Sequence, residues 1–285
     1  VNYGYKTYGD DFWKNVSGDA AAFKGLFYPL QKGIKTFSGK DFKTFRRDAL
    51  NYYKQNIQKE KETFPTADKT VTNYYFPQAA GADTLVYVKE SYQELPSFYY
   101  NTGGVEKKIG LRQIITEDWF DYKAGKVVYT AFATDARWSL IDYSDIVVLD
   151  IETGEEKRLT RKGRYYTPAF APGGETIAAI SINDTLGTEL HLLNSSDGTL
   201  VKKIGARDGS YFLHPQFVNK EELVMGIRQP DGQMNLQLLN TINGTAQPIT
   251  TLSHHTVGYP AVRDNRIYFT ASYKGNDDLY VYDLT

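Results

Sequence analysis

Residues 164–205 read RYYTPAFAPGGETIAAISINDTLGTELHLLNSSDGTLVKKIG and contain four short strand patterns separated by turns. The second pattern, 177–182, is almost wholly apolar, and the third, 189–193, alternates polar and apolar residues with the period of a β-strand. Glycines supply the turns at Gly173-Gly174 and Gly198, because they adopt positive φ without a steric penalty. Four antiparallel strands that become more polar toward the outside are typical of one blade of a β-propeller.

The pattern recurs along the chain at a nearly constant period. Pro168 and Pro215 are 47 positions apart, and Pro215 and Pro260 are 45 apart. Pro77 lies 91 positions before Pro168, and the repeat between them carries Asp121 or Tyr122 in place of the proline. A β-sandwich, the alternative, would not space its turns so evenly. The sequence therefore predicts a mainly β fold, a β-propeller of four-stranded antiparallel blades over residues 70–285, with five repeats at about 73–115, 116–163, 164–209, 210–253 and 254–285.

The fifth repeat ends just after its third strand. Two interpretations follow, because an open propeller leaves a bare sheet edge. Either residues 70–72 supply the missing fourth strand and close a five-bladed ring, or further blades follow Thr285 in a longer protein. The abrupt start at Val1 favours the second interpretation, a truncated propeller.

Residues 1–64 form a small helical segment in this interpretation, and the polar, charged stretch 55–69 marks the boundary to the propeller. We expect a short helix over 8–16 and a second helix that begins after Gly18 with Asp19 as its cap. A third helix opens with an approximate capping box at Ser38–Asp41. Pro29 falls inside the second helix and should kink or split it. Its apolar face comprises Phe23, Phe27, Leu30, Ile34 and Phe37.

Composition excludes several classes of function. The chain has 33 basic and 34 acidic residues and a net charge of −1, so no overall field attracts nucleic acid or an anionic membrane. No apolar run is long enough to span a bilayer. The chain has no cysteine, which rules out disulfides and thiolate metal sites. We expect neither nucleic-acid binding nor membrane insertion, and the oligomeric state is left open.

The segments PAFAPGGETIAAIS, from Pro168, and ELHLLNSSDG, from Glu189, resemble the WD-like repeat of TolB-type β-propellers. The family's usual Ser-Pro-Asp-Gly turn reads Ala171-Pro172-Gly173-Gly174 here. The resemblance implies a propeller of a bacterial envelope or secreted protein, periplasmic or at the cell envelope, with a protein or peptide as its partner. Members of the family include scaffolds, propellers attached to hydrolases, and enzymes, so the resemblance does not specify an activity.

The helical segment resembles the C-terminal tail of gluzincin-type peptidase domains. Tyr8-Gly9, Phe12-Trp13 and the stretch SGKDFKTFRRDALNYY from Ser38 carry this resemblance. Such peptidases bind zinc through a His-Glu-x-x-His helix, and this chain has no such motif. The resemblance therefore implies that a catalytic part, if one exists, lies upstream of Val1.

The chain itself offers no catalytic, cofactor or metal site. Its four histidines, His191, His214, His254 and His255, have no metal-ligand partners at helical spacing, and no nucleophile elbow occurs. The glycine pairs are turn residues and not phosphate cradles. We therefore nominate no catalytic residue, no metal ligand and no cofactor.

Aromatic residues recur just before the inner strand of each repeat, where they would lie near the mouth of the central channel. There they could bind a peptide or a sugar, or they could pack one blade against the next. His214 occupies a similar place before the inner strand of the fourth repeat. The candidate ligand-binding residues are Tyr75, Trp119, Tyr166, Tyr211, His214 and Tyr259.

Two functions are compatible with the sequence and its resemblances. The first is a non-catalytic protein- or peptide-binding scaffold propeller of a bacterial envelope or secreted protein. The alternative is the accessory propeller of a zinc metallopeptidase whose catalytic part lies upstream of this fragment. A His-Glu-x-x-His helix in the preceding sequence would favour the peptidase, and its absence would favour the scaffold.

Overall fold

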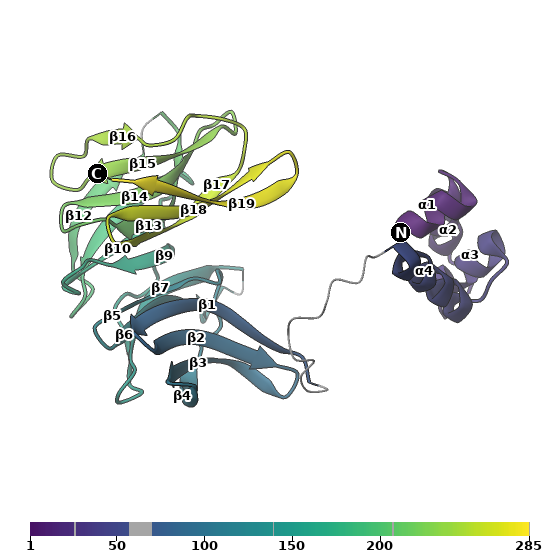
Figure 1. Ribbon diagram of the computed structural model, residues 1–285, viewed down its shortest axis with the longest axis horizontal. Coiled ribbons are helices and arrows are strands. Elements are labelled where there is room, and N and C mark those ends of the chain that lie inside the picture. Colours follow the sequence, from purple (N-terminus) through teal and green to yellow (C-terminus); the bar gives the residue numbers. More distant parts are fainter. Residues whose placement is uncertain (26, 57–69, 139, 207, 285) are drawn as a thin grey trace. The chain divides into compact units, whose positions relative to one another are not determined.

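The computed structural model describes residues 1–25, 27–56, 70–138, 140–206 and 208–284, and it divides into two compact units (Figure 1). The first unit, Val1–Asp68, is helical in its described part, and the second, Lys69–Thr285, consists of β-sheets.

Four helices make up the described part of the first unit: α1 (Asn2–Tyr8), α2 (Phe12–Ala21), α3 (Pro29–Ser38) and α4 (Phe42–Asn56). Each contributes to one small apolar core, in which Val16 and Ile34 are almost fully buried. Aromatic rings fill the rest of this core, and Phe12 and Phe45 stack with ring centroids 5.7 Å apart. Packing between the helices thus stabilises elements that would be marginal alone.

The helix expected after Gly18 is split, which is one of the two outcomes expected from Pro29: α2 ends at Ala21 and α3 begins at Pro29. Proline fits the first helical position, where its missing N–H is not needed, and this explains the split. Phe23 and Phe27 are 72% and 70% exposed and therefore do not share the buried face of Ile34. Asp19 lies inside α2, so it does not cap a helix; its carboxylate pairs with Lys24 at 2.7 Å.

The expected helix over 8–16 is likewise two helices, α1 and α2, which meet around Gly9. The glycine has φ 91°, a backbone conformation that other residues rarely adopt.

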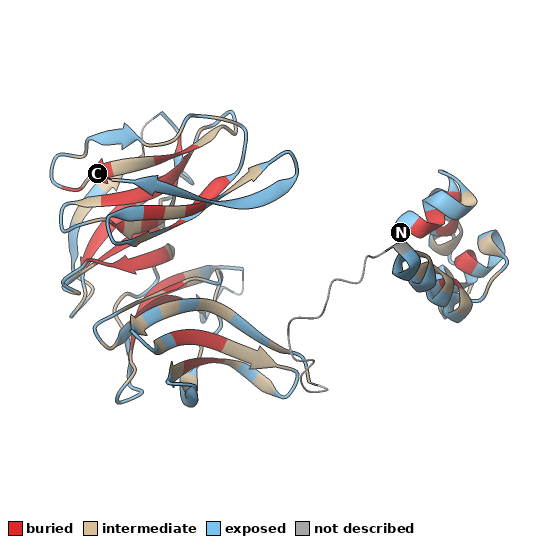
Figure 2. Ribbon diagram, viewed as in Figure 1, coloured by how far each residue is buried: buried red, intermediate tan, exposed pale blue. Residues whose placement is uncertain are grey.

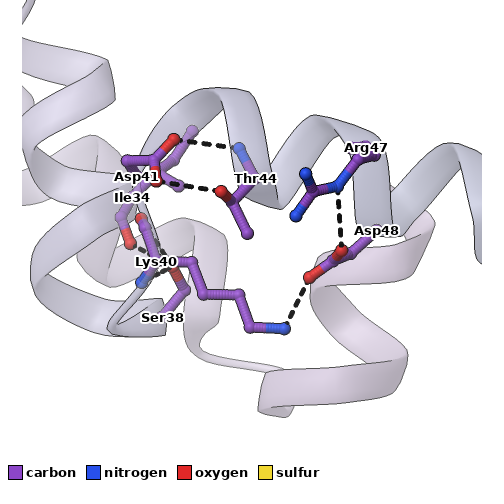
Figure 3. Close-up of polar contacts among 7 residues, drawn as sticks. All are labelled: Ile34, Ser38, Lys40, Asp41, Thr44, Arg47 and Asp48. Carbon is purple, nitrogen blue, oxygen red and sulfur yellow. Dashed lines mark hydrogen bonds and ion pairs between the residues drawn. The ribbon is translucent and has the colours of Figure 1, made fainter.

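Asp41 caps α4, as Figure 3 shows. Its carboxylate accepts hydrogen bonds from the backbone N–H and the hydroxyl of Thr44, both at 2.9 Å. These bonds hold the pKa of Asp41 below its usual value. Ser38, expected to open the capping box, instead donates its hydroxyl to the carbonyl of Ile34 at 2.6 Å within α3. The cap is therefore a single aspartate and not a box that starts at Ser38.

We expect Asp41→Ala to lower the stability of the helical unit by about 1 kcal/mol, because α4 loses its N-cap acceptor. Asp41→Asn should retain most of the stability, since asparagine caps helices nearly as well. Amide hydrogen exchange across α4 in the full chain measures the effect. Equal exchange rates in the two variants would contradict a capping role for Asp41.

The second unit contains four four-stranded antiparallel sheets and one three-stranded sheet among its described residues. The strands of the first two sheets are β1 (Thr72–Gly81), β2 (Thr84–Ser91), β3 (Glu94–Thr102), β4 (Val105–Leu111), β5 (Phe120–Lys123), β6 (Lys126–Thr134), β7 (Asp142–Asp150) and β8 (Glu156–Arg158). Those of the other three are β9 (Tyr165–Phe170), β10 (Thr176–Ile182), β11 (Thr188–Asn194), β12 (Leu200–Gly205), β13 (Tyr211–Phe217), β14 (Glu222–Arg228), β15 (Met234–Asn240), β16 (Ala246–Pro248), β17 (Val257–Arg263), β18 (Arg266–Tyr273) and β19 (Asn276–Asp283).

The sheets are the blades of a propeller, which confirms the predicted fold class. Strands follow sequence order within each blade, and the first strands of successive blades contact one another: β1 with β5, β5 with β9, β9 with β13, and β13 with β17. The buried residues of these sheets, red in Figure 2, form apolar clusters that each combine residues of two neighbouring blades. Phe98 of the first blade, for example, packs edge-on against Phe120 and Tyr129 of the second, with centroids 5.4 and 5.1 Å away. Apolar burial between blades is therefore the main source of stability.

Strand β19 pairs with β18 along its whole length, from Asn276 opposite Tyr273 to Asp283 opposite Arg266. Among the described residues no strand pairs with its other edge, and every residue of β19 is exposed (Figure 2). Thr72, a candidate for closing the ring, pairs with Ser91 of β2 inside the first blade. Residues 70–72 therefore do not supply the fourth strand of the fifth blade.

The repeated prolines mark a bulge in the innermost strand. The residue before each proline has a positive φ: 49° at Phe76, 44° at Thr167, 48° at His214 and 51° at Tyr259. The pairing with the second strand shifts register at each of these positions. Proline cannot donate to the ladder, and within sheets it is confined to bulges and edges. In the second blade, where Asp121 replaces the proline, β5 pairs with β6 without a shift.

Candidate functional site

The bulges of three blades place rings against Trp119 of the second blade at the centre of the propeller. Trp119, just before β5, lies at centroid distances of 6.1 Å from Phe76, 5.2 Å from His214 and 6.1 Å from Tyr259. His214 and Tyr259 are 4.4 Å apart. We call Phe76, Trp119, His214 and Tyr259 the central aromatic cluster. Three of its members stand directly before a proline, so the bulge determines their position.

A cavity of ≈ 480 Å³, the N-terminal cavity, opens where the inner strands begin. Tyr166, Thr167 and Tyr211 line it together with His214. Glu117, from the segment before β5, places its Oε1 3.3 Å from the Nε2 of His214. This contact favours a proton on Nε2, which leaves Nδ1 free to accept a hydrogen bond in the neutral ring.

Three polar atoms at the centre have no hydrogen-bond partner in the part of the chain that the structure describes: Nε1 of Trp119, Oγ1 of Thr167 and Nδ1 of His214. Thr167 is only 3% exposed, and the side chain of His214 is 13% exposed. A buried polar atom without a partner costs about 1–3 kcal/mol, so a bound group that supplies partners gains affinity. The site can therefore satisfy both a donor and an acceptor on a ligand.

A second cavity of ≈ 570 Å³, the C-terminal cavity, opens where the inner strands end, and all five blades line it. Trp119 lines this cavity, whereas His214 lines the N-terminal one, so the central aromatic cluster separates the two. Asp121 is its acidic residue. The carboxylate accepts the N–H of Phe170 from the third blade at 2.7 Å, and burial raises the pKa of Asp121 to about 6.

The sequence-nominated residues fall into three groups. Trp119, His214 and Tyr259 belong to the central aromatic cluster, and Tyr166 and Tyr211 line the N-terminal cavity. Tyr75 is placed differently: its hydroxyl donates to Glu90 at 2.9 Å within the first blade.

The structure adds Phe76 and Thr167 to the site. The signal that could have identified them is their place directly before Pro77 and Pro168, the same place that His214 and Tyr259 occupy. Packing between blades, the alternative role for the aromatics, applies to Tyr166, which also lies against the core between the third and fourth blades.

His191 takes part in a separate buried contact within the third blade. Its Nε2 lies 2.9 Å from Glu189, and its Nδ1 lies 3.2 Å from the hydroxyl of Tyr165. Both ring nitrogens thus have protein partners, as expected for a buried histidine. Within the described ranges no group of three or more histidine, aspartate or glutamate side chains is placed to hold a metal ion.

None of the helices in the described chain is long and apolar enough to span a membrane. No family model matches the sequence, and no curated protein matches it either.

Solved structures similar to this chain include TolB from Acinetobacter baumannii, with 13% identity and a TM-score of 0.49 over 68% of this chain and 50% of that one. Acylaminoacyl peptidase from Pyrococcus horikoshii shows 12% identity and a TM-score of 0.48 over 75% of this chain and 45% of that one. The propeller domain of the Trilobed protease from Pyrococcus furiosus shows 11% identity and a TM-score of 0.46, covering 76% and 82%. The chain thus spans half the length of the TolB structure.

Proposed function

We propose that this chain is a non-catalytic, protein- or peptide-binding propeller that holds an extended segment of its partner at the N-terminal cavity. The observation that carries the proposal is that Thr167 and His214 both line this cavity and that each has a buried polar atom without a protein partner in the described chain. Main-chain amides of an extended segment present both a donor and an acceptor, which is the combination that these atoms require.

The surroundings of the cavity support binding by burial. Tyr211 and Tyr259 are 41% and 53% exposed, so part of each ring is available to a partner. Large aromatic side chains next to a pocket are the residues that most often dominate the affinity of protein interfaces. We further propose a bacterial envelope or secreted location, periplasmic or at the cell envelope; this rests on the resemblance of the repeat to TolB-type propellers.

Selection of random peptides by display against the chain, followed by fluorescence anisotropy with the selected peptides, tests this function. We expect Thr167→Val to weaken binding about tenfold, because it removes one hydrogen-bonding group while keeping the shape of the side chain. Tyr75→Phe is the matched control, since Tyr75 donates to Glu90 away from the cavity, and its affinity should be unchanged. Failure to select any peptide, or equal affinity of both variants, would overturn the proposal.

A second candidate is the accessory propeller of a zinc metallopeptidase. The observation that favours it is the separate helical unit with its own core, in the part of the sequence that resembles a gluzincin tail. We expect this chain alone to show no hydrolysis of casein in the presence of zinc. Chelator-sensitive turnover by the purified chain would contradict that expectation.

A further inference from the structure

A third cavity, of ≈ 360 Å³, lies between the second and third blades. We call it the outer cavity. The connection between β6 and β7 contributes Leu140 and Ile141, and the connection between β10 and β11 contributes Leu186. Both connections link second strands to third strands, so they lie at the end of the blades where the inner strands begin. The outer cavity is therefore on the same face as the N-terminal cavity.

The two cavities adjoin each other. Thr116, Tyr166 and Ile182 line both of them. A groove thus runs from the central aromatic cluster outward across Tyr166 to Leu140 and Leu186. An extended chain that enters the centre would leave along this groove.

The outer part of the groove exposes two large apolar side chains. Leu140 is 96% exposed and Leu186 is 69% exposed. Leu186 has φ 64°, and hydrogen bonds from Gly187 and Thr185 to the side chain of Asn183, at 2.9 and 3.1 Å, fix the turn that carries it. The turn therefore holds a large apolar side chain at the surface, where a partner could cover it.

Charges differ between the two ends of the groove. Arg228 lines the N-terminal cavity and forms no ion pair within the described residues, whereas the nearby Glu117 already faces His214. Asp142 lines the outer cavity, and the Arg164 guanidinium beside it lies 3.9 Å from Asp184. A carboxylate on a partner is thus favoured beside Arg228 at the inner end, and less so beside Arg164 at the outer end, because Arg164 already contacts Asp184.

We propose that this groove binds an extended peptide segment that places a bulky apolar side chain in the outer cavity and an acidic residue beside Arg228. The proposal rests on the proposed function and adds the chemistry and direction of the segment. The three supporting features are independent: the shared lining of the cavities, the exposed leucines, and the cation without an ion pair.

The test uses peptides selected by display from a random library against the whole chain, measured by fluorescence anisotropy. The selected sequences should share a bulky apolar residue and an aspartate or glutamate. Leu186→Asp should weaken their binding at least tenfold, because it places a charge in the apolar end of the groove. Ile242→Asp is the matched control: Ile242 is 66% exposed and follows β15, at the opposite end of the blades, so binding should be unchanged.

The acidic residue is tested by a double-mutant cycle. Arg228→Gln should weaken the acidic peptide several-fold and leave unchanged the affinity of its counterpart in which asparagine or glutamine replaces the acid. Peptides that lose affinity with Thr167→Val but not with Leu186→Asp or Arg228→Gln would overturn this inference and leave the proposed function standing. Absence of any selected peptide would overturn both.

Discussion

Gly198→Ala should lower the free energy of unfolding by about 3 kcal/mol or more. Alanine is strained at the backbone angles of this turn, and its methyl group would clash with Leu159 of the second blade. Gly198 has φ 77°, in the left-handed region that costs other residues about 1 kcal/mol. A Cβ at this position would clash with the carbonyl oxygen of Leu159 and lie 2.8 Å from its carbonyl carbon. Leu159 follows the outer strand of the second blade, so relief of the clash requires the second and third blades to move apart.

The matched control is Gly244→Ala in the fourth blade. Gly244 occupies the equivalent turn and has φ 71°. A Cβ added there would have no neighbouring atom within 4 Å among the residues that the structure describes. Only the backbone cost of about 1 kcal/mol is expected there. Urea unfolding of both variants, compared with the parent chain, measures the difference. Equal losses would mean that contact between the two blades at Leu159 is not a constraint on the fold.

Asp121→Asn should stabilise the propeller at pH 8 by as much as about 3 kcal/mol. Burial raises the pKa of Asp121 from 3.8 to about 6 in the folded chain. The neutral form is therefore favoured by folding: the associated stability is fully present below pH 3.8 and is lost as the pH rises through 6. Asparagine stays neutral at every pH and can still accept the N–H of Phe170.

Urea unfolding of both chains at pH 3.5 and pH 8 tests this prediction. The two chains should be similar in stability at pH 3.5, and the variant should be more stable at pH 8. Asp150→Asn provides a contrast, because backbone N–H groups of Thr153 and Glu152 lower the pKa of Asp150. That variant should lose stability at pH 8. A gain from Asp121→Asn that does not change with pH would rule out ionisation as its cause.

The sequence predicted the blades because their determinants are local and repeated. Alternation within strands, glycine turns and the proline period each follow from backbone chemistry, and the structure places Pro77, Pro168, Pro215 and Pro260 equivalently. The helical unit was predicted less well, because the pattern from Phe23 to Phe37 fits one helix until Pro29 is recognised as a first helical residue. Spacing alone does not show which apolar residues are buried.

The candidate site could be predicted only in part. Aromatic residues near the inner strands are visible in the sequence. Which of Tyr75 and Phe76 joins the central aromatic cluster depends on the bulge, where the pairing of β1 with β2 shifts register between Tyr75 and Gln78. Thr167 is not aromatic, so the recurring aromatic pattern before the inner strands does not identify it. Its importance comes from burial without a partner, a property of the assembled blades.

The bulge at each proline creates one equivalent position in each of four blades, and this position accepts different side chains. Phenylalanine, threonine, histidine and tyrosine occupy that position in four blades, while the proline behind them stays the same. A substitution there changes the side chain that the channel presents and, at Phe76, His214 or Tyr259, also a ring contact with Trp119 of another blade. The chemistry of the channel and the packing at the centre of the propeller therefore vary together, one blade at a time.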